Sequence, residues 1–111
     1  MDRPIIVCLC GSMRREFADA WRRAYREGSL AHKIVLAAAV MAGDEPIGND
    51  DPRKPGLDDL HKRKIDLADE VLILNVGGYV GPSTASEINY AKAQGKTLRW
   101  LEPDKAKNPN V

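Results

Sequence analysis

The sequence predicts an α/β fold in which a parallel sheet is covered by helices on both faces. Three short runs of apolar, partly β-branched residues, at positions 5–10, 34–38 and 71–74, are each followed by a segment with helical features. A fourth run at residues 97–101 completes the series. Strands that alternate with helices are typical of parallel sheets with right-handed crossovers. We therefore expect about four or five strands.

Composition and charge restrict the classes of partner. The 17 basic and 16 acidic residues leave a net charge of +1, which gives no electrostatic case for binding long nucleic acid. The longest apolar run, residues 34–42, is too short to span a bilayer, and no secretory signal pattern opens the sequence. We expect a cytoplasmic protein without a membrane segment. One domain is expected at residues 1–102, with a polar tail at 103–111.

The first strand, residues 5–10, is a near-continuous apolar run that suits the centre of a sheet. The following segment is predicted to be a helix that ends at Gly28-Ser29. Its apolar residues share one face: Phe17, Trp21, Ala24 and Tyr25. Cys8 and Cys10 alternate along the strand and should point to the same face as buried, reduced thiols. We expect no disulfide, no metal site and no cofactor.

The second half of the chain contributes two further helices. Residues 41–56, rich in glycine, proline and acidic residues, are expected to form a long loop before a helix at about 55–68. One face of that helix carries Leu57, His61, Ile65 and Ala68. A last helix is expected at about 83–94, with Gly95 ending it. The architecture predicted is a small flavodoxin-like or Rossmann-like three-layer sandwich.

Candidate ligand-binding residues cluster after the first strand, where the segment Gly11-Ser12-Met13-Arg14 opens a helix. Backbone N–H groups, the Ser12 hydroxyl and the Arg14 guanidinium could hold a phosphate or a sugar hydroxyl. The alternative is an ordinary turn with Ser12 as helix N-cap. The segment matches neither the dinucleotide-binding nor the P-loop pattern.

The second candidate segment follows the third strand. Asn75 could orient a ligand through its amide, and Gly78 could let the backbone lie close to one. Tyr79 is either a stacking surface for a base or part of the loop's packing. Ser83 begins the next helix, and Glu87 is expected in its first turn. There Glu87 either completes a capping box with Thr84 or serves as a carboxylate facing the crevice.

His61 is expected to point inward, toward the sheet or its crevice. It is either a hydrogen-bonded core histidine or, close to a carboxylate, a general acid or base that titrates near neutrality. Asp69, just before the third strand, is expected to be a structural turn residue.

Taken together, these stretches resemble the nucleoside 2-deoxyribosyltransferase family and its relatives, the 2′-deoxynucleoside 5′-phosphate N-hydrolases. The matching segments are residues 10–14 (CGSMR), 67–71 (LADEV), 83–91 with Glu87-Ile88-Asn89-Tyr90-Ala91, and Gly95-Lys96. The resemblance extends from residue 5 to residue 101, except for the loop at 41–56. The chain has His61 where the family usually has an aspartate, and Cys8 where it often has a tyrosine.

The resemblance implies cleavage of an N-glycosidic bond, by hydrolysis or transfer, in a deoxynucleotide or deoxynucleoside. Glu87 would be the nucleophile of a double displacement through a covalent glycosyl intermediate, kept ionised by the helix dipole, and His61 would supply a proton to the base. Ser12, Arg14 and Ser83 would hold a 5′-phosphate, which Gly11 lets the backbone approach. A homodimer or higher homo-oligomer is implied. The alternative is a non-catalytic nucleotide-binding or sensor domain of the same fold.

Overall fold

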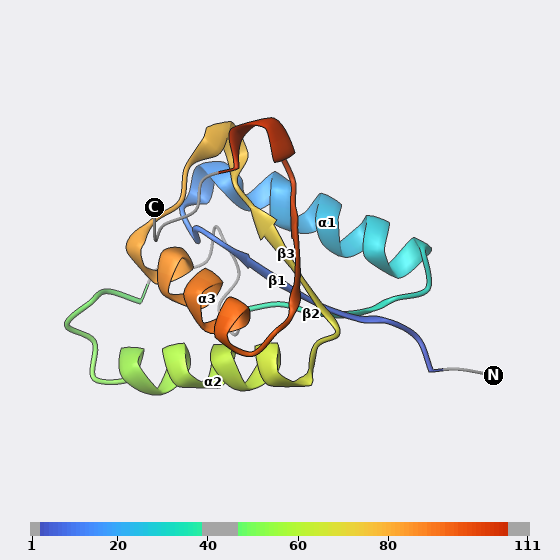
Figure 1. Ribbon diagram of the computed structural model, residues 1–111. Coiled ribbons are helices and arrows are strands. Elements are labelled where there is room, and N and C mark those ends of the chain that lie inside the picture. Colours follow the sequence, from blue (N-terminus) through green and yellow to red (C-terminus); the bar gives the residue numbers. More distant parts are fainter. Residues whose placement is uncertain (1–2, 39–46, 107–111) are drawn as a thin grey trace.

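The chain folds into a three-layer α/β sandwich, which confirms the predicted fold class (Figure 1). The computed structural model describes residues 3–38 and 47–106. The middle layer is a four-stranded parallel sheet in the order β2-β1-β3-β4. Its strands are β1 (Ile6–Gly11), β2 (Ile34–Leu36), β3 (Glu70–Leu74) and β4 (Thr97–Trp100).

Helices cover both faces of this sheet. Helix α1 (Ala18–Leu30) lies on one face, and α2 (Lys54–Leu67) and α3 (Pro82–Ala93) lie on the other (Figure 1). Side chains alternate across a strand, so β1 contributes to two cores. Val7 and Leu9 pack with Trp21 on the α1 side. Cys8 and Cys10 pack on the other side, with a set that includes Ile65 and Ile88.

The order of the strands creates an opening at one end of β1. The chain leaves β1 toward β2 on one side, whereas β3 pairs with the opposite side of β1. The connections after β1 and β3 therefore diverge at the carboxyl ends of these strands. This is the topological switch point at which open α/β sheets bind ligands.

Two details of α1 differ from the expectation. The helix continues past Gly28 to Leu30, because Gly28 lets it approach the sheet: a Cβ there would lie 2.7 Å from Cγ2 of Val35. Tyr25 is 51% exposed instead of buried. Tyr25 points about 100° further around the helix than buried Ala24, away from the sheet.

Glu102, the last residue of the expected domain, is held against the loop after β3. The Asn75 side chain donates to the Glu102 carbonyl (3.0 Å) and accepts from its N–H (2.9 Å), and the Glu102 carboxylate accepts from the Gly77 N–H (2.7 Å). A 3₁₀ turn follows at Pro103–Lys105. Residues 107–111 of the expected tail, and residues 41–46 of the expected loop, lie outside the described residues. Helix α2 begins within that loop, at Lys54.

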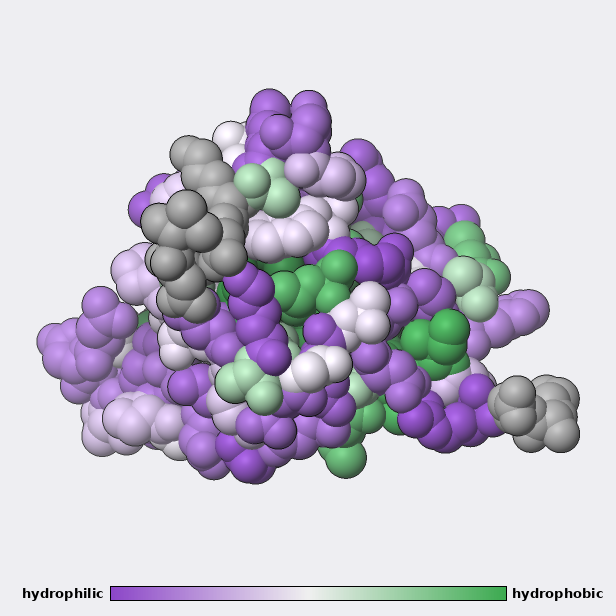
Figure 2. All heavy atoms as spheres, viewed as in Figure 1, coloured by the Kyte–Doolittle hydropathy of each residue, from purple (hydrophilic) through white to green (hydrophobic). Residues whose placement is uncertain are grey.

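The face seen in Figure 2 is mostly hydrophilic, with hydrophobic residues gathered near its middle. Among residues 3–38 and 47–106, the helices are all too short or too polar to cross a membrane.

Candidate functional site

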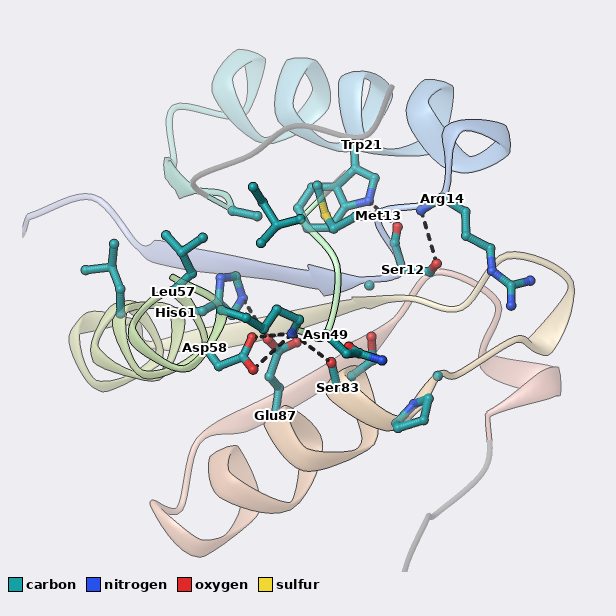
Figure 3. A pocket seen from close by; sticks show the side chains of 18 of the residues that line it. Ser12, Met13, Arg14, Trp21, Asn49, Leu57, Asp58, His61, Ser83 and Glu87 are labelled. Carbon is teal, nitrogen blue, oxygen red and sulfur yellow. Dashed lines mark hydrogen bonds and ion pairs between the residues drawn. The ribbon is translucent and has the colours of Figure 1, made fainter. Parts of the chain in front are cut away.

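A cavity of about 470 Å³ opens at the carboxyl ends of the strands, where the topology predicts a site (Figure 3). Its walls are formed by the turn after β1, helix α2, and the loop and first turns of α3, with Trp21, Ala38, Ile47 and Asn49 completing the lining. Seven of the nine residues proposed from the sequence line it: Gly11, Ser12, Arg14, His61, Tyr79, Ser83 and Glu87. Asn75 and Gly78 are not among the lining residues.

The turn after β1 is braced by its own hydrogen bonds. The Ser12 hydroxyl accepts from the Arg14 N–H (3.2 Å), and the Ser12 carbonyl accepts from the Trp21 indole N–H (2.9 Å). Gly11 is required by strand packing, because a Cβ there would lie 3.0 Å from Leu74 Cβ. The Ser12 hydroxyl and the Arg14 guanidinium remain at the cavity wall, where they could receive an anionic group.

Tyr79 packs within the loop instead of presenting a free ring. Its ring stacks on Phe17 with centroids 5.8 Å apart, and the Arg14 guanidinium carbon lies 4.5 Å from the centroid. Of the two interpretations of Tyr79, these contacts favour packing. They also fix the position of Arg14 through a cation–π interaction.

Glu87 projects from α3 toward the cavity (Figure 3). The helix begins at Pro82 with Gly81 as its N-cap, and the N-cap makes no side-chain hydrogen bond. The capping-box prediction is therefore wrong, and so is the placement of Glu87 in the first turn. Proline is favoured at the first helical position, which moves the start of the helix upstream of Thr84. Glu87 consequently lies in the second turn, with its side chain 14% exposed.

The carboxylate of Glu87 faces the imidazole of His61. Glu87 Oε2 lies 3.7 Å from His61 Nε2, and both side chains are mostly buried. Burial raises the pKa of Glu87 to about 7, although nearby His61 acts in the opposite direction. Burial thus opposes the expected ionisation of Glu87 at pH 7, because the dipole effect fades beyond the first turn and desolvation has the larger effect on its pKa.

His61 combines the two roles proposed for it, since it packs in the core and also lines the cavity. Burial by itself would lower the pKa of His61. The interaction with Cys8 and the negative charge of Glu87 outweigh that effect, and the pKa is raised. The imidazole can therefore carry a proton near neutral pH.

Three charged residues of α2 that line the cavity were missed by the sequence reasoning: Lys64 and the ion pair of Lys54 with Asp58. Lys54 Nζ binds both carboxylate oxygens of Asp58 (2.7 and 2.9 Å) and lies 3.5 Å from the Ser83 hydroxyl, and all three residues line the cavity. Helical spacing could have identified the ion pair. Residues 54, 58 and 61 follow an i, i+4, i+7 pattern and so share the face that carries His61.

A cluster of sulfur and nitrogen atoms lies beneath the cavity. His61 Nε2 is 3.8 Å from Cys8 Sγ and 3.3 Å from Cys10 Sγ. The two cysteines point to the same face as free buried thiols, as predicted. Although no metal site was expected from the sequence, Cys8, Cys10 and His61 bring their ligand atoms within 4.8 Å of one another. Sequence spacing could not reveal it, because α2 supplies the histidine from a distant part of the chain.

The two thiols of the cluster differ in pKa. The hydrogen bond between them lowers the pKa of Cys8 and raises the pKa of Cys10. Burial and the charge of Glu87 add to the increase at Cys10. Cys8 is thus the thiol that ionises first.

Asn75 and Gly78 contact the turn that follows β4 and do not line the cavity. Asn75 is fully buried, and its amide is engaged by the Glu102 backbone. Gly78 has a φ of 84° and lies against Lys105. A Cβ at Gly78 would be 3.4 Å from the Cβ of Lys105. The structure thus places neither residue in the cavity wall, because the turn after β4 occupies the position beside them.

Comparisons of the chain with protein-family models, with curated proteins and with solved structures found no match. The cavity itself carries two sets of polar groups. Its walls offer a buried carboxylate next to an imidazole on one side, and an arginine with a serine hydroxyl on the other. This set suits a small polar ligand that carries an anionic group.

Proposed function

We propose that the protein cleaves the N-glycosidic bond of a deoxynucleotide or deoxynucleoside. The observation that carries the proposal is the pairing of Glu87 with His61, 3.7 Å apart, in the wall of a cavity that also contains Ser12 and Arg14. A volume of about 470 Å³ is within the usual range for small-molecule sites. The sequence resemblance to nucleoside 2-deoxyribosyltransferases supports the same assignment.

The proposed reaction is a double displacement. The ionised Glu87 carboxylate attacks the anomeric carbon as the bond to the base breaks, and protonated His61 gives its proton to the departing base nitrogen. The resulting glycosyl ester is then attacked by water, or by a second base in a transfer reaction. The attacking group gives its proton to His61, which was deprotonated in the first step, and Glu87 is released as a carboxylate. The raised pKa of His61 supports the role of proton donor.

Arg14 and Ser12 are proposed to bind a 5′-phosphate at the other end of the cavity. A guanidinium held over Tyr79 can donate two parallel hydrogen bonds to phosphate oxygens. Lys54 supplies a second cation at the cavity wall. Recognition of a phosphate favours hydrolysis of nucleotides over transfer between nucleosides. The enzyme is proposed to act in the cytoplasm as a homodimer or higher homo-oligomer, which sedimentation analysis would test.

A non-catalytic nucleotide-binding or sensor domain is the second candidate. The raised pKa of Glu87, about 7, favours it, because a partly protonated carboxyl can donate a hydrogen bond to a ligand as well as accept one. Such a domain would bind the same ligands in the same cavity without releasing a base.

Incubation with each deoxynucleoside monophosphate and each deoxynucleoside, followed by chromatography, tests the proposal. Wild-type protein should release free base from at least one of them. Glu87→Gln keeps the shape of the side chain but removes the nucleophile, so release should fall to background while ligand binding persists. It should not reduce stability, because burial disfavours the charged form. Unchanged release by Glu87→Gln would refute the mechanism, and binding without release by wild type would favour the sensor.

A further inference from the structure

The cluster beneath the cavity has the composition of a metal site. Cys8 and Cys10 come from the central strand β1 and are fully buried, and His61 reaches them from α2 at 7% exposure. Nothing in the proposed glycosidic chemistry requires two thiols at this position. We propose that Cys8, Cys10 and His61 bind a zinc ion, with the fourth coordination position directed toward Glu87.

Distances within the cluster fit tetrahedral coordination. Zinc–sulfur bonds of about 2.3 Å and zinc–nitrogen bonds of about 2.0 Å place a sulfur and a nitrogen ligand about 3.5 Å apart at tetrahedral angles. The two sulfur-to-Nε2 distances are 3.8 and 3.3 Å. All three ligand atoms lie within 4.8 Å of one another, so adjustments of these side chains could bring them to the distances of a zinc site.

The ligand types select the metal. Thiolate and imidazole ligands suit zinc, whereas magnesium and calcium prefer oxygen. Binding displaces the thiol protons to solvent, and the two thiolate charges then balance the charge of the ion. A buried site with these ligands is consequently neutral, which makes its burial less costly than that of an isolated charge.

Glu87 gives the site an open side. Its Oε2 atom lies 3.7 Å from His61 Nε2, and Glu87 and His61 both line the cavity, whereas Cys8 and Cys10 lie below it. An ion can thus enter from the cavity. Three protein ligands with a position facing a cavity are typical of zinc sites that keep an exchangeable ligand.

The zinc proposal does not depend on the proposed function, but the two are linked through His61. A metal-bound Nε2 has no proton to give to a departing base, so zinc should inhibit base release. Metal binding is observed directly on the protein, whether or not a base is ever released. Failure of either proposal would therefore leave the other standing.

Titration of the untagged, reduced, chelator-treated protein with Co²⁺ is the direct test. We expect one Co²⁺ per chain, with the intense visible bands of tetrahedral cobalt and a near-ultraviolet thiolate charge-transfer band, both abolished when Zn²⁺ displaces the cobalt. Zn²⁺ should also raise the melting temperature, and a chelator should reverse the rise. Absence of both bands in wild-type protein would overturn the proposal and leave an ordinary core histidine among thiols.

Variants identify the ligands. Cys10→Ser should weaken the charge-transfer band at least twofold, because only the Cys8 thiolate remains, and His61→Asn should lose tetrahedral binding. His32→Asn is the matched control: His32 is exposed, and its φ of 61° is one that asparagine tolerates. It should bind Co²⁺ like wild type. If Cys10→Ser fails to fold, the comparison of His61→Asn with His32→Asn still tests the proposal. Equal Co²⁺ binding by these two variants would contradict the proposed site.

Discussion

At the scale of single residues, the largest differences between expectation and structure concern polar side chains. Asn75 shows this most clearly: it follows a strand at the edge where ligands bind, yet its amide bonds the Glu102 backbone. An asparagine in sequence offers the same donors and acceptor to a ligand or to the chain. Only the position of residue 102, brought alongside by β4, decides between them.

Replacing Asn75 should therefore affect stability and not ligand affinity. Asn75→Ala leaves the Glu102 N–H and carbonyl without their partner in a part-buried position, at a cost of about 1–3 kcal/mol. Urea denaturation measures this cost. Asn89→Ala is the control, because the buried Asn89 Oδ1 has no hydrogen-bond partner among the described residues. A larger loss of ligand binding than of stability would restore Asn75 as a ligand-binding residue.

At the scale of elements, strand pairing is fixed by residues at both ends of β1. At the carboxyl end, Gly11 lies opposite Leu74, and at the amino end Asp69 accepts from the Ile6 N–H (2.8 Å). Asp69 also binds Arg3 through both oxygens (2.6 and 2.7 Å), which confirms its structural role. Apolar runs predicted the strands themselves. The contacts at the two ends of β1 could not be predicted, because they depend on the register in which β1 pairs with β3.

Gly11→Ala should destabilise the β1–β3 pair. Its Cβ would lie 3.0 Å from Leu74 Cβ and 3.2 Å from the Leu74 carbonyl oxygen, and overpacking of this kind costs about 1–3 kcal/mol. Gly56→Ala is the matched control in α2, where a Cβ meets nothing within 4 Å. It should increase stability by about 0.5–1 kcal/mol. Thermal unfolding of both variants would test this, and equal effects of the same sign would contradict it.

Asp69 should make stability depend on acid pH. Its hydrogen bonds with Arg3 lower its pKa to about 2 from an ordinary 3.8. Since the pKa is lower in the folded state, the stabilisation is present above pH 3.8 and is lost as the pH falls toward 2. Asp69→Asn should thus be less stable than wild type at pH 7, and the difference should shrink at pH 2.

Denaturant titrations at the two pH values measure this dependence. Asp59→Asn on α2, whose carboxylate lies 3.8 Å from Arg63, serves as the exposed control and should change little. A destabilisation by Asp69→Asn that is the same at both pH values would show that the charge of Asp69 is unimportant.

At the scale of the whole molecule, the cavity joins segments that are far apart in the chain. The turn at residues 11–14 supplies the groups proposed to bind phosphate, while α2 and α3 supply His61 and Glu87. The parallel topology brings them to one edge of the sheet. Substitutions in the turn at residues 11–14 should therefore affect recognition of a different part of the proposed substrate than substitutions in α2 and α3.

Arg14→Ala should weaken binding of a deoxynucleoside monophosphate but not of the deoxynucleoside. Loss of a hydrogen bond to a charged group costs about 1.5–3 kcal/mol, which corresponds to about a 10- to 150-fold increase in KM or Kd. Arg22→Ala, on the exposed side of α1 and paired with Asp19, is the control. Calorimetric titration or steady-state kinetics gives the comparison. An equal loss for both ligands would place the phosphate elsewhere.

The sequence by itself determined the layers of this protein, since apolar runs and helical stripes reflect burial that is local in sequence. It also identified seven residues of the cavity wall, because the carboxyl ends of parallel strands converge on one edge. The tertiary structure decided which polar side chains are free. Asn75 is engaged by residue 102, Glu87 lies one turn deeper in α3 than expected, and Cys8 and Cys10 meet His61. These outcomes depend on contacts between distant segments, which sequence periodicity does not encode.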